Sequence, residues 1–146
     1  MECGLALDVS GTSIFLKPAA PQPAVKREDT DNQKLLNQAC NGDEKCVCIN
    51  NAIFKHDSSW ATKGVGARAK NPCNMRMPST WEPTGIIAST QGAVGHFAVY
   101  DSLENGINGC VELYSRFYAD LDPYTLTTRW AQTHDKNYHN AVASCF

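Results

Sequence analysis

The chain has 146 residues, of which 42% are hydrophobic and 19% are charged, and its formal net charge at pH 7 is -2. These values are typical of one soluble globular domain, and a chain of this length buries about two thirds of the surface that it exposes when unfolded. A net charge so close to zero gives no electrostatic reason to expect a nucleic acid as a partner. No run of about 18 apolar residues occurs, so the sequence predicts no transmembrane segment.

The first part of the chain, residues 1–30, is predicted to be an extended arm. It contains three prolines separated by alanines and then the charged run at residues 26–29, a composition that cannot bury a core. Residues 4–16 are mildly apolar, but an aspartate interrupts them and no basic segment precedes them, so they make a poor signal peptide. We expect the arm to serve for attachment, and residues 31–146 to form one domain.

Two helices are predicted at the start of this domain. The side-chain oxygens of residues 30–31 can cap a first helix that ends near residues 41–42. Asp43 or Glu44 opens the second helix, whose apolar residues recur on one face as far as about Ser58.

The middle of the chain, residues 59–95, contains eight glycines and prolines, which break helices. We therefore expect loops there, with at most a short irregular hairpin, and loops of this kind often wall a cleft. The alternation of polar and apolar side chains over residues 96–100 predicts a strand.

The last part of the domain is predicted to contain three helices. A capping box at residues 101–104 opens the first, whose apolar side chains recur every 3.6 residues as far as about Tyr118, as expected of a central buried helix. Shorter helices are predicted at residues 124–132 and 136–145, with Asp135 as the cap of the second. The predicted fold class is therefore mainly α with a small β hairpin.

Seven cysteines are many for this length, and six of them fall in the predicted domain, which favours disulfide bonds and an oxidising destination. Six cysteines allow 15 pairings, and we expect only that Cys40 bonds to Cys46 or Cys48. The spacing of the last two is one residue tighter than the pairs that hold zinc, so no metal or other cofactor is predicted. A cysteine-rich chain without a visible export signal suggests transport in a virus particle.

Asp57 is the first candidate for a catalytic residue. It is spaced four residues from Ile53, which is itself four from Ile49, so the three share one helix face and the apolar pair lies in the core. The negative end of the helix dipole and partial burial against Phe54 or Trp60 both raise the pKa of a carboxyl group. An acid that stays protonated near neutral pH is what a glycosidase needs to protonate the leaving oxygen of a sugar bond.

Four segments of the chain match, in the same order, segments of one enzyme superfamily. Residues 52–64 resemble the stretch Glu-Ser-x-Trp-Gly that follows a buried helix in the lysozyme-like superfamily, which includes glucosaminidases and lytic transglycosylases. Residues 71–76 look like the Asn-Asn-Pro-Gly-Asn-Ile-Arg element of phage virion proteins of this superfamily. Residues 97–107 and 128–132 resemble later segments of the same virion proteins, so that the resemblance covers about residues 38–145.

The resemblance implies a lysozyme-like fold and cleavage of peptidoglycan glycan strands by a lytic transglycosylase or a muramidase or glucosaminidase-type domain, with Asp57 as general acid. It also implies a virion protein that acts in the bacterial periplasm or cell wall and whose arm contacts other virion proteins. Glycan sites combine aromatic faces with amide groups. The residues expected to contact the sugar are Ser58, Asn71, Asn74, Tyr100, Trp130, Gln132, Asn137 and Tyr138.

The match departs from the superfamily at three positions, one of which is Ala61, where Gly is usual. Asp57 replaces the usual Glu, which shortens the reach of the carboxyl by one bond, about 1.5 Å, and a displacement near 1 Å can cost about 100-fold in rate. A non-catalytic virion structural or assembly protein is therefore one alternative. Cys73 replaces a glycine of the family, which suggests a disulfide to Cys110. A cell-wall cysteine peptidase with Cys73 as nucleophile and His96 as base is the other alternative.

Overall fold

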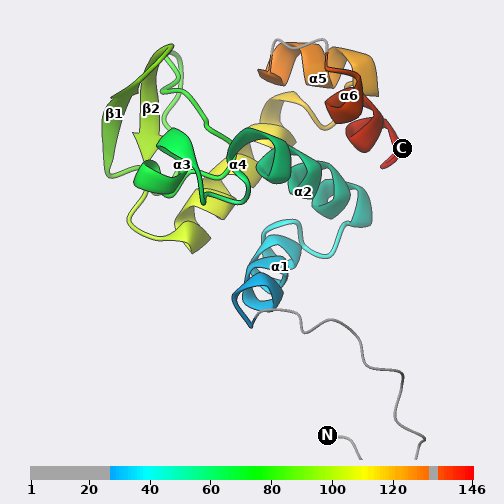
Figure 1. The fold of residues 1–146 in the computed structure, drawn as a ribbon, viewed down its shortest axis with the longest axis horizontal. Helices are drawn as coiled ribbons and strands as arrows, with labels where there is room; N and C mark the ends of the chain where they lie inside the picture. Colours follow the sequence, from blue (N-terminus) through cyan, green and yellow to red (C-terminus); the bar gives the residue numbers. More distant parts are fainter. Residues whose placement is uncertain (1–26, 132–134) are drawn as a thin grey trace, which may run out of the picture.

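The computed structural model describes residues 27–131 and 135–146, which contain six helices and one two-stranded sheet. The elements in chain order are α1 (Arg27–Ala39), α2 (Glu44–Ser58), α3 (Gly64–Ala69), β1 (Ala88–Gly92), β2 (Gly95–Val99), α4 (Leu103–Phe117), α5 (Pro123–Ala131) and α6 (Lys136–Ala143). The helices α2 and α4 lie in the middle of the molecule, with α3 and the hairpin at one end, α5 and α6 at the other, and α1 below them (Figure 1). The predicted class, mainly α with a small hairpin, is confirmed.

Most helix ends lie where local sequence signals predict them. Asp43 caps α2 by accepting a hydrogen bond from the third helical N–H, and Asp135 caps α6 by accepting from two N–H groups of its first turn. The capping box predicted Asp101 as the cap of α4, but the cap is the next residue, Ser102. Its hydroxyl accepts a hydrogen bond from the third helical N–H. Glu104, which the capping box would have turned back toward the helix start, is exposed.

Two regions differ from the sequence-based expectation. The helix α1 begins at Arg27, inside the charged run that we assigned to the arm; the remaining arm residues, 1–26, lie outside the described residues. The expectation that glycines exclude a helix from residues 59–95 was wrong, because α3 forms there. Gly66 allows this helix to pack closely: a Cβ at this position would lie only 2.6 Å from the Cβ of Ser58. The glycine is needed for packing and does not interrupt the helix.

The hairpin is regular, in contrast to the irregular one expected. The strands β1 and β2 pair antiparallel over five residue pairs, from Ala88 with Val99 to Gly92 with Gly95, across a two-residue loop. The strand predicted over residues 96–100 is confirmed to within one residue at each end. Of its side chains, those of Phe97 and Ala98 are buried, and β2 packs against α3. The hairpin therefore joins the core through β2.

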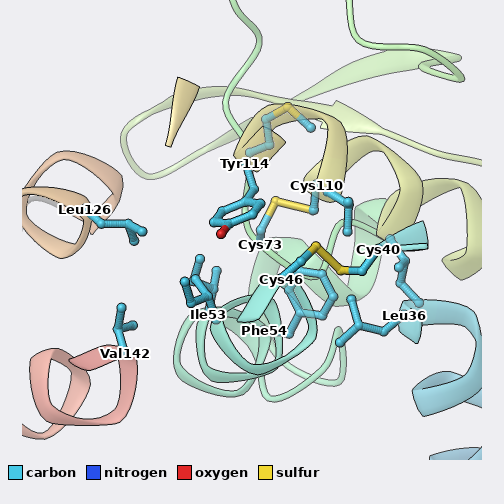
Figure 2. Packing of buried hydrophobic residues seen from close by; sticks show 14 of the residues in the cluster. Leu36, Cys40, Cys46, Ile53, Phe54, Cys73, Cys110, Tyr114, Leu126 and Val142 are labelled. Atoms are coloured by element: carbon cyan, nitrogen blue, oxygen red, sulfur yellow. A yellow bond between two sulfur atoms is a disulfide. The ribbon is translucent and has the colours of Figure 1, made fainter. Parts of the chain in front are cut away.

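The core lies around α2, which packs against α1, α3, α4 and α6. Figure 2 shows Ile53 of this helix facing Tyr114 from α4 and its neighbour Phe54 pointing to the α1 side, with Leu126 from α5 and Val142 from α6 next to Ile53. All five side chains are buried. Because five helices contribute to one core, the position of each helix end is set by its neighbours as well as by its own sequence.

Three disulfide bonds fasten this core: Cys40–Cys46, Cys48–Cys145 and Cys73–Cys110. Two expectations are confirmed: that Cys40 bonds to Cys46 or Cys48, and that Cys73 bonds to Cys110. The second bond closes a separation of 97 residues, and a link of that length stabilises a fold by about 5 kcal/mol through the entropy of the unfolded chain. Among the described residues, no helix is both long and apolar enough to cross a membrane.

Candidate active site around Asp57

Asp57 lies in the last turn of α2, directly before a sharp turn of the chain. Ser59, Trp60 and Ala61 all have positive φ, at 48°, 59° and 60°. The left-handed conformation costs a non-glycine residue about 1–2 kcal/mol, and such strain is concentrated at functional sites. Trp60 holds the turn, because its backbone N–H donates to the carbonyl of Phe54 at 2.9 Å and its indole N–H donates to the Asn51 side-chain oxygen at 3.0 Å. The backbone that follows the acid is therefore fixed.

The carboxyl of Asp57 is mostly withdrawn from solvent, with 11% of its side chain exposed. Burial raises its pKa from 3.8 to about 6, while a hydrogen bond and the charge of His56, and hydrogen bonding by the Trp130 side chain, oppose the rise. The sequence predicted that the pKa of Asp57 is raised, and this direction is confirmed, with burial as the main cause. Because the pKa lies near 6, a substantial fraction of Asp57 carries a proton in weakly acidic conditions, as a general acid requires.

His56 connects Asp57 to the last helix. Its Nδ1 lies 3.1 Å from Asp57 Oδ1, and its Nε2 lies 3.7 Å from Asp135 Oδ2, the carboxylate that caps α6. The imidazole stacks on the ring of Tyr138 with centroids 3.8 Å apart and planes 5° apart. An imidazole held this way presents one nitrogen to the acid in a fixed direction, which keeps the carboxyl in one orientation. His56 and Asp135 were not among the predicted site residues.

A cavity of about 220 Å³ lies near Asp57, although Asp57 is not among the residues that line it. Two of its lining residues contact the acid: Asn74 donates from its side-chain amide to the Asp57 backbone carbonyl at 2.7 Å, and Trp130 takes part in the hydrogen bonding of the carboxyl. The full set of lining residues is Cys73, Asn74, Met75, Arg76, Pro78, Trp81, Leu113, Tyr118, Arg129 and Trp130. The cavity therefore combines three aromatic side chains, an amide and two arginines next to a proton donor.

Four of the predicted sugar-contacting residues are buried, at most 2% exposed: Ser58, Asn71, Tyr100 and Tyr138. The Ser58 hydroxyl donates to the backbone carbonyl of Pro72 at 2.6 Å, and the Asn71 amide donates to two backbone carbonyls, one of them on β2. Tyr138 supports His56 with its ring, while its hydroxyl has no hydrogen-bond partner among the described residues. None of the four lines the cavity, and in this structure they are not accessible to a sugar.

The other four predicted residues are placed differently. Asn74 and Trp130 line the cavity next to Asp57, as a sugar contact requires. Asn137 is exposed in the first turn of α6 and does not line the cavity, and Gln132 lies outside the described residues. Two of the eight predicted contacts therefore lie at the cavity.

The arrangement of Cys73 corrects one alternative. Its sulfur is bonded to Cys110, and the residue is buried. A nucleophilic cysteine reacts as a thiolate, which a disulfide does not provide. The proposed peptidase pair is wrong for this reason, and His96 lies exposed on β2. No group of three His, Cys, Asp or Glu side chains within the described ranges is placed to hold a metal ion.

Comparison of the chain with models of protein families, with curated proteins and with solved structures finds no match. The functional argument therefore rests on the chemistry of the cavity and of Asp57.

Proposed function

We propose that this chain is a peptidoglycan-cleaving enzyme of lysozyme-like architecture that breaks glycosidic bonds of the glycan strand, with Asp57 as its general acid. The observation that carries the proposal is a carboxyl group whose pKa burial raises to about 6 and which is hydrogen-bonded to Trp130, a residue that lines a cavity with aromatic walls. Glycosidases position such an acid to protonate the leaving oxygen of the sugar bond.

The order of the sequence segments supports the same proposal. Residues 52–64 supply Asp57, residues 71–76 supply Asn74 to the cavity, and residues 128–132 supply Trp130. These three segments lie apart in the chain, yet Asn74 reaches the backbone carbonyl of Asp57 and Trp130 reaches its carboxyl group. The resemblance on which the enzyme class rests thus concerns residues that surround a single site.

The chemistry that fits the cavity is a transglycosylase reaction. Protonated Asp57 donates its proton to the glycosidic oxygen as the bond from that oxygen to the anomeric carbon breaks. This reaction needs no second carboxylate to activate water; a carboxylate found near the acid, that of Asp135, is separated from Asp57 by the imidazole of His56. The 6-hydroxyl of the muramic acid attacks the anomeric carbon instead and passes its proton to the Asp57 carboxylate, which closes a 1,6-anhydro ring and restores the acid.

The proposal also includes the place of action. Association with a virion, and attachment to other virion proteins through the N-terminal arm, are supported by the resemblance of residues 71–76 to phage virion proteins and by the three disulfide bonds, which persist in oxidising surroundings outside the cytoplasm.

The test is digestion of purified peptidoglycan, with the products identified by mass. The wild type should release fragments with anhydro-muramic ends, and Asp57→Asn should lower the rate by at least about 100-fold because it removes the proton donor. Asp120→Asn removes an exposed carboxylate that does not line the cavity and serves as the control. Fragments with reducing ends would indicate a hydrolase that uses water. No products from the wild type would contradict the proposal and favour the non-catalytic virion protein.

A second variant examines the shorter acid. Asp57→Glu extends the carboxyl by one bond, about 1.5 Å. Faster digestion by this variant would show that the reach of Asp57 limits the reaction, whereas slower digestion would show that the cavity is built around the shorter side chain.

A further inference from the structure

The charged residues that line the cavity near Asp57 are all positive among those described. Arg76 and Arg129 both line it, and no acidic residue does so among those described, although the chain as a whole has a net charge of -2. Both side chains are exposed, and neither arginine forms an ion pair within the described residues. Two arginines therefore line one small cavity, and neither is paired with a carboxylate among the described residues.

The two arginines are held on separate, well-anchored elements. The backbone of Arg76 bridges to Phe97 on β2. On one side the Met77 N–H donates to the His96 carbonyl, and on the other the Met75 carbonyl accepts from the Ala98 N–H, which holds the segment against the strand. Arg129 lies on α5, close enough to Tyr118 that its charge opposes the rise in the pKa of that phenol. One arginine thus comes from the segment beside the hairpin and the other from α5, whose Trp130 both lines the cavity and hydrogen-bonds to Asp57.

From this arrangement we infer that the cavity binds a carboxylate-bearing unit of the glycan, with the carboxylate held by Arg76 and Arg129. The guanidinium group of arginine presents a planar set of N–H donors that matches a carboxylate, and aromatic side chains such as Trp81 supply a flat apolar surface for a sugar ring. At about 220 Å³ the cavity has room for one small unit of a strand, next to the acid. This inference rests on the proposed function, since it names the substrate class of the same site.

Peptidoglycan offers this carboxylate from two sources. The lactyl group of muramic acid carries a free carboxylate when the side peptide has been removed, and the side peptide carries carboxylates of its own when it is present. Chitin oligosaccharides have the same type of sugar backbone with no carboxylate. These three ligands separate recognition of the charge from recognition of the sugar, and they distinguish the two sources of the charge.

The experiment measures binding on the Asp57→Asn protein, which cannot donate a proton and so leaves the ligands intact. Tryptophan fluorescence reports the binding, because two of the three tryptophans, Trp81 and Trp130, line the cavity. We expect at least one of the two charged glycan oligomers to bind at least 10-fold more tightly than a chitin oligomer of equal length. The difference should shrink as salt is added, because salt screens exposed charges.

Variants of the two arginines test whether the tighter binding of charged glycan oligomers arises in this cavity. Adding Arg76→Gln or Arg129→Gln should weaken binding of the charged glycan about 10-fold and leave binding of chitin unchanged. Arg68→Gln removes an exposed arginine that does not line the cavity and should leave both affinities as they were. Equal affinity for charged and neutral oligomers, or an equal loss for both in the arginine variants, would overturn the inference.

The two proposals fail in different ways. Cleavage by the wild type without any preference for charged ligands would remove the inference and leave the proposed function in place. A preference for charged ligands that depends on the two arginines, without cleavage by the wild type, would do the reverse.

Discussion

Replacing Asp57 by asparagine should make the protein more stable at neutral pH. The ionised carboxyl is buried, and burial raises its pKa from 3.8 to about 6. A shift of one pKa unit corresponds to 1.36 kcal/mol, so the ionised form costs the folded state about 3 kcal/mol. The folded protein binds the proton more tightly than the unfolded chain does, so the stability of the wild type falls as the pH rises from about 4 to about 6 and then levels off. Asparagine has a similar shape and no charge, so its stability should not fall in this window.

The assay is reversible unfolding of both proteins at pH 4 and pH 7, with the disulfides intact. At pH 7, Asp57→Asn should be more stable by up to about 3 kcal/mol, on the order of 10 °C in the midpoint, and at pH 4 the two proteins should be nearly equal. Asp122→Asn is the control with the opposite sign. Hydrogen bonds from Thr125 lower the pKa of that exposed carboxyl, so replacing the carboxyl should slightly destabilise the folded protein at neutral pH.

Two results would refute the reasoning. If Asp57→Asn is less stable than the wild type at pH 7, the ionised carboxyl is stabilised by its surroundings and its pKa is not raised. If the difference between the two proteins is the same at pH 4 and pH 7, the effect comes from packing and not from the charge.

Three further predictions concern the same site. The rate of peptidoglycan cleavage should fall as the pH rises above about 6, since Asp57 loses the proton that it donates; a rate that keeps rising to pH 8 would contradict this role. His56→Phe keeps a flat ring but removes the hydrogen bond that lowers the pKa of Asp57. The pH at which the cleavage rate falls should therefore move upward. If this pH stays the same or moves downward, His56 does not act on the acid. Gly66→Ala would place a methyl group 2.6 Å from the Cβ of Ser58 and 2.7 Å from Oδ1 of Asn74. This overlap should lower the free energy of unfolding by about 1–3 kcal/mol, measured by thermal or chemical unfolding. Unchanged stability would mean that Ser58 and Asn74 can move aside freely.

Local sequence signals determined much of the fold. Caps and periodic apolar residues located α2 and α6 to within a residue or two, because a capping carboxylate such as Asp43 acts on N–H groups only three residues away. The same local reasoning placed Asp57 at the end of a buried helix and predicted the direction of its pKa. Neighbours along the helix suffice for the first inference, whereas the burial that raises the pKa of Asp57 comes from the packing of the folded chain.

The tertiary structure alone decided what surrounds the acid. Nothing within a few residues of His56 indicates that its imidazole stacks on Tyr138 and faces Asp135, since these contacts arise only when α6 packs against α2. In the same way, Ser58 and Asn71 look like polar groups available to a sugar, but their hydrogen bonds go to backbone carbonyls that the folded chain brings to them. Helix ends follow from interactions over three or four residues, whereas the cavity and the partners of Asp57 depend on how separate helices pack together.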